Sequence, residues 1–326
     1  MKFVHQNLLR SAGILTMMLA CSGTAFASNY PNQPIRLLLG YTPGGAADAT
    51  ARSIAPKLSE VLGQPVVIEY KAGAGGGIAA EAAARATPDG YTLHLIDSGA
   101  MVILPNIRKI NFDPLTSFTP IGMAADSGLV LVAHPSLPAK TLPELIALLK
   151  EKPGQYSYAT SGVGGGGHVA GEQLKIATGT SMQHVAYRGG GPAMADLIGG
   201  QISLGVSTLA PAIPQIRAGT IRALGVTSLK RSSSIPDVPT IAEQGVEGFE
   251  ALNWFAIVGP KGLPDDVVKK VNSALKTTLA SKEVQHALQE QGLDAIGGSP
   301  EQLMQQIRTD LDKWKTVVQT AGIKAE

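Results

Sequence analysis

The chain has 326 residues, and 44 % of them are hydrophobic, which is enough apolar material for two cores. With 27 basic and 25 acidic residues the formal net charge is only +2, which gives no support for nucleic-acid or anionic-membrane binding. The single cysteine excludes an intrachain disulfide, and no apolar run approaches the ~20 residues needed to span a bilayer.

The first 27 residues have the pattern of a secretory signal peptide. Lys2 and Arg10 give a positive start, an apolar run covers residues 12–21, and Ala25-Phe26-Ala27 is a small-x-small cleavage site. We therefore predict cleavage after Ala27 and a periplasmic mature protein. A lipoprotein processed at Cys21 is the weaker alternative, because Met18 is a poor first residue for a lipoprotein processing box.

Removal of the signal peptide would leave 326 − 27 = 299 residues. The mature chain would lose Lys2, Arg10 and the only thiol, so 25 basic residues would balance 25 acidic ones. We therefore expect no iron–sulfur cluster, no cysteine nucleophile and no nucleic-acid partner.

The mature chain alternates short apolar strands with amphipathic helices, which is typical of α/β units. The first block contains expected strands at 35–39, 66–70 and 91–96, with helices from about 48 to 62 and after the glycines at 73–77. The second block contains expected strands at 129–132, 156–160, 184–187, 202–206, 221–226 and 254–258, with helices at 142–150, 168–178 and after Pro192. Only helices are expected after it, at 264–279, 282–291 and 299–321.

Two similar blocks followed by helices suit a chain that leaves one lobe, builds a second and returns. We expect crossings near 129–132 and 251–258. This assigns residues 28–128 and 259–326 to lobe 1, and residues 129–258, including the hinge crossings, to lobe 2.

Three glycine-rich turns each follow an expected strand and open an expected helix: 42–45, 162–167 and 189–191. A helix start offers unpaired N–H groups and about half a positive charge, and glycine lets an anion approach the backbone. Any one turn can equally be a plain strand–helix connection. Three of them, spread over both blocks, favour an anion cleft between lobes.

No catalytic or metal-binding pattern occurs in the mature chain. Residues 162–167 satisfy the dinucleotide fingerprint G-x-G-x-x-G, but the next strand ends in Arg188 and Gly189 rather than in the acid that would bind a ribose. There is no G-x-S-x-G elbow or phosphate-binding P-loop, and no histidine pair at helical metal spacing. We therefore expect a binding protein rather than an enzyme, with no metal and no cofactor.

Three polar residues near these turns are candidates for a role at the site. His168 could donate to an anion or only orient its loop, and Arg188 could be a cleft counter-charge or a solvated side chain. Asp48 would repel an anion at close range, so we interpret it as a helix-dipole partner that stiffens the first turn. Asp48 and Arg188 are therefore expected behind the ligand contacts.

Several short motifs, in order along nearly all of the mature chain, resemble the substrate-binding proteins of tripartite tricarboxylate transporters, the Bug/TctC family. They lie at 43–52 (P-G-G-x-x-D-x-x-A-R), 63–67 (G-Q-P-V-V), 88–93 (P-D-G-Y-T-L), 187–193 (Y-R-G-G-G-P-A), 222–224 (R-A-L) and 236–243 (P-D-V-P-T-I-A-E).

The resemblance implies a two-lobed periplasmic-binding-protein fold of the Venus flytrap, type II-like kind. It also implies a small organic carboxylate ligand, membrane transporter subunits as partners, and a monomeric protein. The ligand contacts that it implies are Tyr41, Thr42, Gly44, Gly45, Ala46 and Ser98 in lobe 1, and Ser161, Gly164, Gly165, His168, Gly189, Gly190, Gly191 and Ser207 or Thr208 in lobe 2.

The chain departs from the family at Gly165, where a serine is usual. Two other classes stay open at this point: a ligand-sensing subunit for a two-component signalling system, and an exported hydrolase. The sequence does not distinguish dicarboxylates, tricarboxylates, aromatic acids and acidic amino acids as ligands.

Overall fold

The computed structural model describes residues 30–187 and 189–323. The expected signal peptide with Ala27 and Cys21, and also Arg188, lie outside the described residues.

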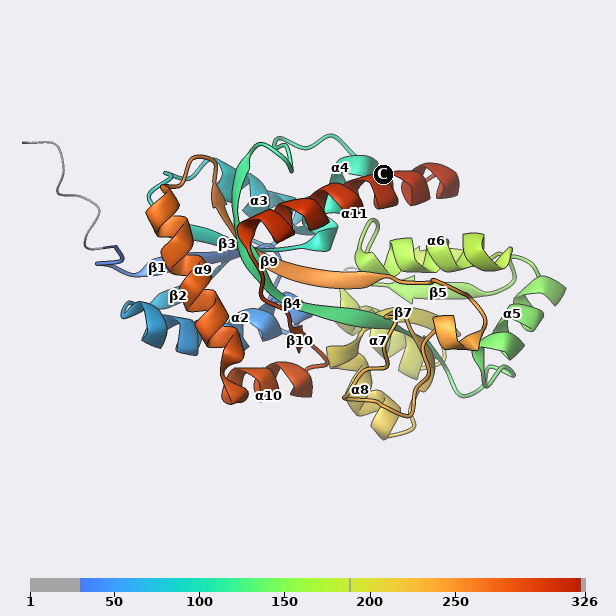
Figure 1. Ribbon diagram of the computed structural model, residues 1–326. Coiled ribbons are helices and arrows are strands. Elements are labelled where there is room, and N and C mark those ends of the chain that lie inside the picture. Colours follow the sequence, from blue (N-terminus) through green and yellow to red (C-terminus); the bar gives the residue numbers. More distant parts are fainter. Residues whose placement is uncertain (1–29, 188, 324–326) are drawn as a thin grey trace, which may run out of the picture.

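A curled mixed sheet runs through the molecule, and its strands follow the order β2-β1-β3-β9-β4-β7-β5-β6 (Figure 1). The first block is parallel: β1 (Ile35–Leu39) lies between β2 (Val66–Tyr70) and β3 (Thr92–Asp97). Its helices are α2 (Ala46–Leu62) and α3 (Gly77–Ala84), the latter preceded by the short helix η1 (Ala74–Gly76). Because Leu37 packs into one hydrophobic cluster and Leu38 into another, β1 is buried on both faces from Leu37 onward, which explains its three consecutive leucines.

The second block repeats this arrangement, with β5 (Ser157–Thr160) between β6 (Gln183–Ala186) and β7 (Leu204–Thr208), all parallel. Its helices are α5 (Leu142–Glu151), α6 (Gly166–Thr178), α7 (Gly190–Ile198) and α8 (Leu209–Arg217). The helix α8 was not expected from the sequence. Residues of α7 and α8 form a third hydrophobic cluster with the sheet, so these helices cover one of its faces.

One long strand joins the two blocks. The sequence predicted only residues 129–132, but β4 covers Phe118–Ala133. Its first part pairs with β9 (Leu252–Pro260), and Leu129–Ala133 pair with β7 and β8 (Arg222–Val226). Since β9 also pairs with β3 from Phe255 to Val258, the chain has returned to the first block's strands by Phe255. The lobe bounds expected from the sequence, 28–128 with 259–326 and 129–258, state which residues would move together when the lobes close, and they stay a prediction.

The C-terminal helices α9 (Asp265–Ala280) and α10 (Lys282–Glu290) lie on the first block (Figure 1). The last helix, α11 (Pro300–Ala321), begins at a Ser299–Gln302 capping box and extends to α6 of the second block. The sequence analysis expected no strand here, but β10 (Asp294–Ala295) pairs with β4. It also missed η2 (Gly99–Ile103), α4 (Leu104–Ile107) and the short η3 (Ala242–Gln244). Within the described residues, no helix is long and apolar enough to cross a membrane.

Candidate functional site

Four α-helices have a glycine N-cap and no side-chain cap. Three of them open from the glycine turns predicted above, with Gly45 at α2, Gly165 at α6 and Gly189 at α7, and the fourth is α3 with Gly76. In contrast, α5 and α11 are capped by the hydroxyls of Thr141 and Ser299. The first N–H groups of a helix have no partner inside it, so α2, α6 and α7 present donors that an external acceptor can satisfy.

Asp48 stiffens the turn before α2. Its carboxylate accepts hydrogen bonds from the Gly44 N–H (2.9 Å), from Arg52 Nε (2.8 Å) and from the Tyr70 hydroxyl (2.6 Å). Burial alone would raise the pKa of Asp48, but the hydrogen bonds from Tyr70, Gly44 and Arg52 outweigh it and lower the pKa. The Gly44 amide is thus already used within the protein, while the amides at the start of α2, beginning with Ala46, have no side-chain acceptor.

The other expected lobe 1 residues occupy two environments. Thr42 is exposed, whereas the Tyr41 hydroxyl lies 3.0 Å from Asp97 Oδ2 and 3.2 Å from the Gly75 carbonyl. Burial raises the pKa of Asp97 to about 6 against the opposing hydrogen bond from Tyr41. Ser98 is fully buried, and its hydroxyl donates to Asn253 Oδ1 at 2.9 Å. This bond links the end of β3 to β9, and the sequence analysis did not identify Asn253.

The loop from Gly162 to Gly167 lies against the first block. A Cβ on Gly164 would meet Ile107 of α4 at 2.5 Å, and one on Gly166 would be 4.0 Å from Asn253 Cβ. A larger residue there would displace the end of the Ile107 side chain, and the Gly164 backbone (φ +75°) lies in the left-handed region that favours glycine. The fold therefore brings the α6 turn next to the crossing strands.

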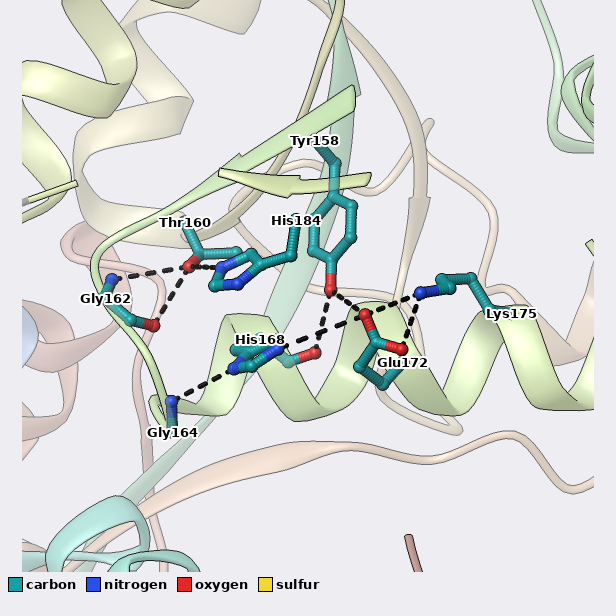
Figure 2. A network of polar contacts seen from close by, with 8 residues as sticks. All are labelled: Tyr158, Thr160, Gly162, Gly164, His168, Glu172, Lys175 and His184. Atoms are coloured by element: carbon teal, nitrogen blue, oxygen red, sulfur yellow. Dashed lines mark hydrogen bonds and ion pairs between the residues drawn. The ribbon is translucent and has the colours of Figure 1, made fainter. Parts of the chain in front are cut away.

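His168 lies behind this loop rather than in open space (Figure 2). Its ring is 7 % exposed, its Nδ1 accepts the Gly164 N–H at 3.1 Å, and it stacks on His184 with centroids 3.7 Å apart. Burial lowers the pKa of both imidazoles to about 4. The Gly164 amide, like that of Gly44, thus has a protein acceptor.

A small cavity of about 40 Å³ opens between α7 and the sheet of the second block. Ser161, Gly190, Ser207 and Thr208 line it together with Thr160 and an apolar set of Val132, Ala159, Ala193, Met194, Leu197, Gly205 and Val206. A Cβ at Gly189, Gly190 or Gly191 would meet nothing within 4 Å, so this turn faces open space. The Gly189 N–H donates to the Ser161 carbonyl at 3.2 Å and so fixes the α7 turn beside the α6 loop.

One hydroxyl–imidazole pair was missed by the sequence analysis. Thr160 Oγ1 lies 2.7 Å from His184 Nε2, the distance expected of a nucleophile and its base. However, Thr160 is only 2 % exposed and its hydroxyl also contacts the Gly162 carbonyl at 3.1 Å, so the oxygen is closed off from a substrate. Among residues 30–187 and 189–323 there is also no group of three or more His, Cys, Asp or Glu side chains that could hold a metal.

Comparison with known proteins supports the resemblance noted above. The family described as "Tripartite tricarboxylate transporter family receptor" (TctC) matches residues 50–323. Protein BugT of Bordetella pertussis is 36 % identical over 98 % of this chain and 99 % of its own length. A solved structure described as a periplasmic transporter is 40 % identical, with a TM-score of 0.84 over 90 % of this chain and 99 % of that one. A structure of an R. palustris protein with adipate is 34 % identical, with a TM-score of 0.84 over 90 % and 99 % of the two chains.

These likenesses confirm the expected fold class, a two-lobed α/β periplasmic-binding-protein fold, and the relatives are solute-binding proteins rather than enzymes. Since the family match covers most of the chain and agrees with the full-length relative, the chain belongs to the TctC family of tripartite tricarboxylate transporter receptors.

Proposed function

We propose that this protein is the extracytoplasmic solute-binding component of a tripartite tricarboxylate-type transporter and that it captures a small organic carboxylate between its lobes. The observation that carries the proposal is the set of three helices, α2, α6 and α7, that begin at uncapped glycines around the crossing strands. A carboxylate oxygen supplies the acceptor that these N–H groups lack.

The direct contacts proposed on the first lobe are the amides at the start of α2, from Gly45 onward, with Tyr41, Thr42 and Gly44 shaping the turn. On the second lobe, we propose the amides that open α6 and α7 together with the hydroxyls of Ser161 and Thr208. The cavity beside them is small and partly apolar, so it suits a methylene group of the ligand better than a second hydrated charge. Adipate, an aliphatic dicarboxylate found in a relative, has this combination and is the first probe.

In this proposal the protein is exported, is cleaved after Ala27, acts as a monomer and delivers its ligand to membrane subunits. A carboxylate that contacts both lobes favours the closed form, and this closed form would be the one that the membrane subunits recognise.

The test has two parts. Native mass spectrometry of protein purified without denaturation should find a bound organic acid, and titration calorimetry with adipate and shorter dicarboxylates should give saturable binding. Incubation of the same probes with clean protein should return them unchanged. Turnover of any of them, or the lack of binding by every carboxylate in the panel, refutes the proposal.

A further inference from the structure

The loop that precedes and opens α6, residues 162–167, is called the α6 loop here, and two histidines contribute to the hydrogen bonds that fix its conformation. Five of its six residues from Gly162 to Gly167 are glycine, so ordering it costs more backbone entropy than ordering a loop with fewer glycines. Its N-cap, Gly165, offers no hydroxyl to the amides that follow. The Gly164 N–H is held by His168 Nδ1, and Thr160 Oγ1, which contacts His184, bonds both the N–H and the carbonyl of Gly162 (Figure 2).

His168 can hold the loop in one protonation state only. Because its Nδ1 accepts a hydrogen bond from Gly164, that nitrogen carries no proton, and the neutral ring has its hydrogen on Nε2. The Nε2 atom lies 4.0 Å from Glu172 Oε1. A second proton would have to sit on Nδ1. The Nδ1–H would then face the N–H of Gly164, and the hydrogen bond that holds Gly164 would be lost.

The acidic side chain beside the pair, Glu172, already has other partners. It accepts from Lys175 Nζ at 2.6 and 2.8 Å and from the Tyr158 hydroxyl at 2.7 Å. Lys175 opposes a positive charge on either ring, and His168 opposes one on His184, where Glu172 acts in the opposite direction but burial outweighs it. Of the strands packed against α6, β5 contributes the titratable Tyr158, and β7 has no titratable side chain. Within the described residues, no charged group of α11 is among the causes that shift the pKa of either histidine.

We propose that His168 and His184 are positioning residues that hold the Gly162–Gly167 loop in its ligand-receiving form, and that they do so only as an uncharged, stacked pair. The proposal rests on the proposed function in that this loop receives a carboxylate. The histidines themselves touch no ligand: they hold the loop through the Gly164 amide and through Thr160, and the amides that follow Gly165 keep no side-chain acceptor.

Two substitutions separate the hydrogen bond from the bulk of the ring. His168→Asn keeps an acceptor oxygen near the position of Nδ1, whereas His168→Leu fills the space without one. His184→Leu removes the partner of Thr160. The exposed His286 on α10 gives the matched control His286→Asn, which changes the same residue type away from the loop.

Residue-resolved amide exchange of the ligand-free protein is the direct measurement. The protection of the Gly164 amide should fall about tenfold or more in His168→Leu, and the protection of Gly162 should fall similarly in His184→Leu. His168→Asn and His286→Asn should keep both within about threefold. Histidine ¹⁵N spectra at pH 7 should show His168 neutral with its proton on Nε2.

Adipate titrations connect the loop to binding. The dissociation constant should rise about tenfold or more in His168→Leu and should be restored to within about threefold in His168→Asn. Equal Gly164 and Gly162 exchange in the wild type and the leucine variants, or a charged His168 at pH 7, overturns the inference. A wild-type protein that binds no carboxylate refutes the proposed function instead, since the exchange and ¹⁵N results decide the histidine roles without any ligand.

Discussion

Gly190→Val tests whether the α7 turn receives the ligand. A Cβ built on Gly190 meets no atom within 4 Å, and its backbone lies outside the left-handed region, so valine fits the folded chain without a clash or strain. The added side chain would instead occupy the space over the cavity that Gly190 lines. The substitution is thus expected to separate binding from folding.

The magnitudes follow from this geometry. Valine is a slightly better helix residue than glycine, so the free energy of unfolding should change by less than about 1 kcal/mol. Binding should lose at least one amide-to-carboxylate hydrogen bond, worth about 1.5–3 kcal/mol, which weakens affinity by roughly 10- to 150-fold.

Titration calorimetry with adipate, together with thermal unfolding, measures both quantities. Ala195→Val is the matched control, because Ala195 lies exposed on the same helix and receives similar bulk. If Gly190→Val is folded and binds within about twofold of the wild type, the α7 turn is only a connection and the proposed contact is wrong.

Four further predictions follow from the structure. Saturating carboxylate should reduce the radius of gyration in small-angle scattering and raise the melting temperature, and an unchanged profile alongside tight binding would rule out hinge closure around β4 and β9. Asp310→Ala should cost about 1–3 kcal/mol of unfolding free energy, because it leaves the buried Trp254 Nε1–H without its 2.6 Å acceptor; the exposed Asp312→Ala should cost almost nothing. Gly165→Ser should stabilise the protein by a few tenths of a kcal/mol, since Gly165 has N-cap backbone angles (φ −75°, ψ 164°) and a Cβ there would lie 3.7 Å from its nearest neighbours; a lower melting temperature would contradict this. Burial lowers the pKa of His94, His168 and His184 to about 4, so at these rings only the unfolded chain takes up protons as pH drops from 6.5 towards 4, and each ring costs up to ~3 kcal/mol of stability. Asp97 and Asp126, whose pKa values burial raises to about 6 and about 7, take up protons in the folded protein and offset part of this loss. Denaturant titrations should therefore show a net fall in stability, and a rise would contradict the shifts.

The local elements of the two blocks were determined by the sequence. The strands β1 and β2 begin and end where the sequence predicts, because both are rich in apolar residues and are bounded by proline or glycine on at least one side. The start of α11 was also local information, since Ser299, Pro300 and Gln302 satisfy its first amides by themselves. The three glycine turns were recognisable because each combines a strand end with a helix start.

The partners of the polar groups were decided by tertiary structure alone. The length of β4 was hidden because two different neighbours, β9 and then β7, supply its hydrogen bonds. His168 and His184 are 16 positions apart in sequence, and only the parallel pairing of β5 with β6 brings His184 beneath the α6 loop. Likewise, Asn253 meets Ser98 across 155 residues. Residue type and local spacing report which groups can donate or accept, whereas the chain's return through distant strands decides which donor meets which acceptor.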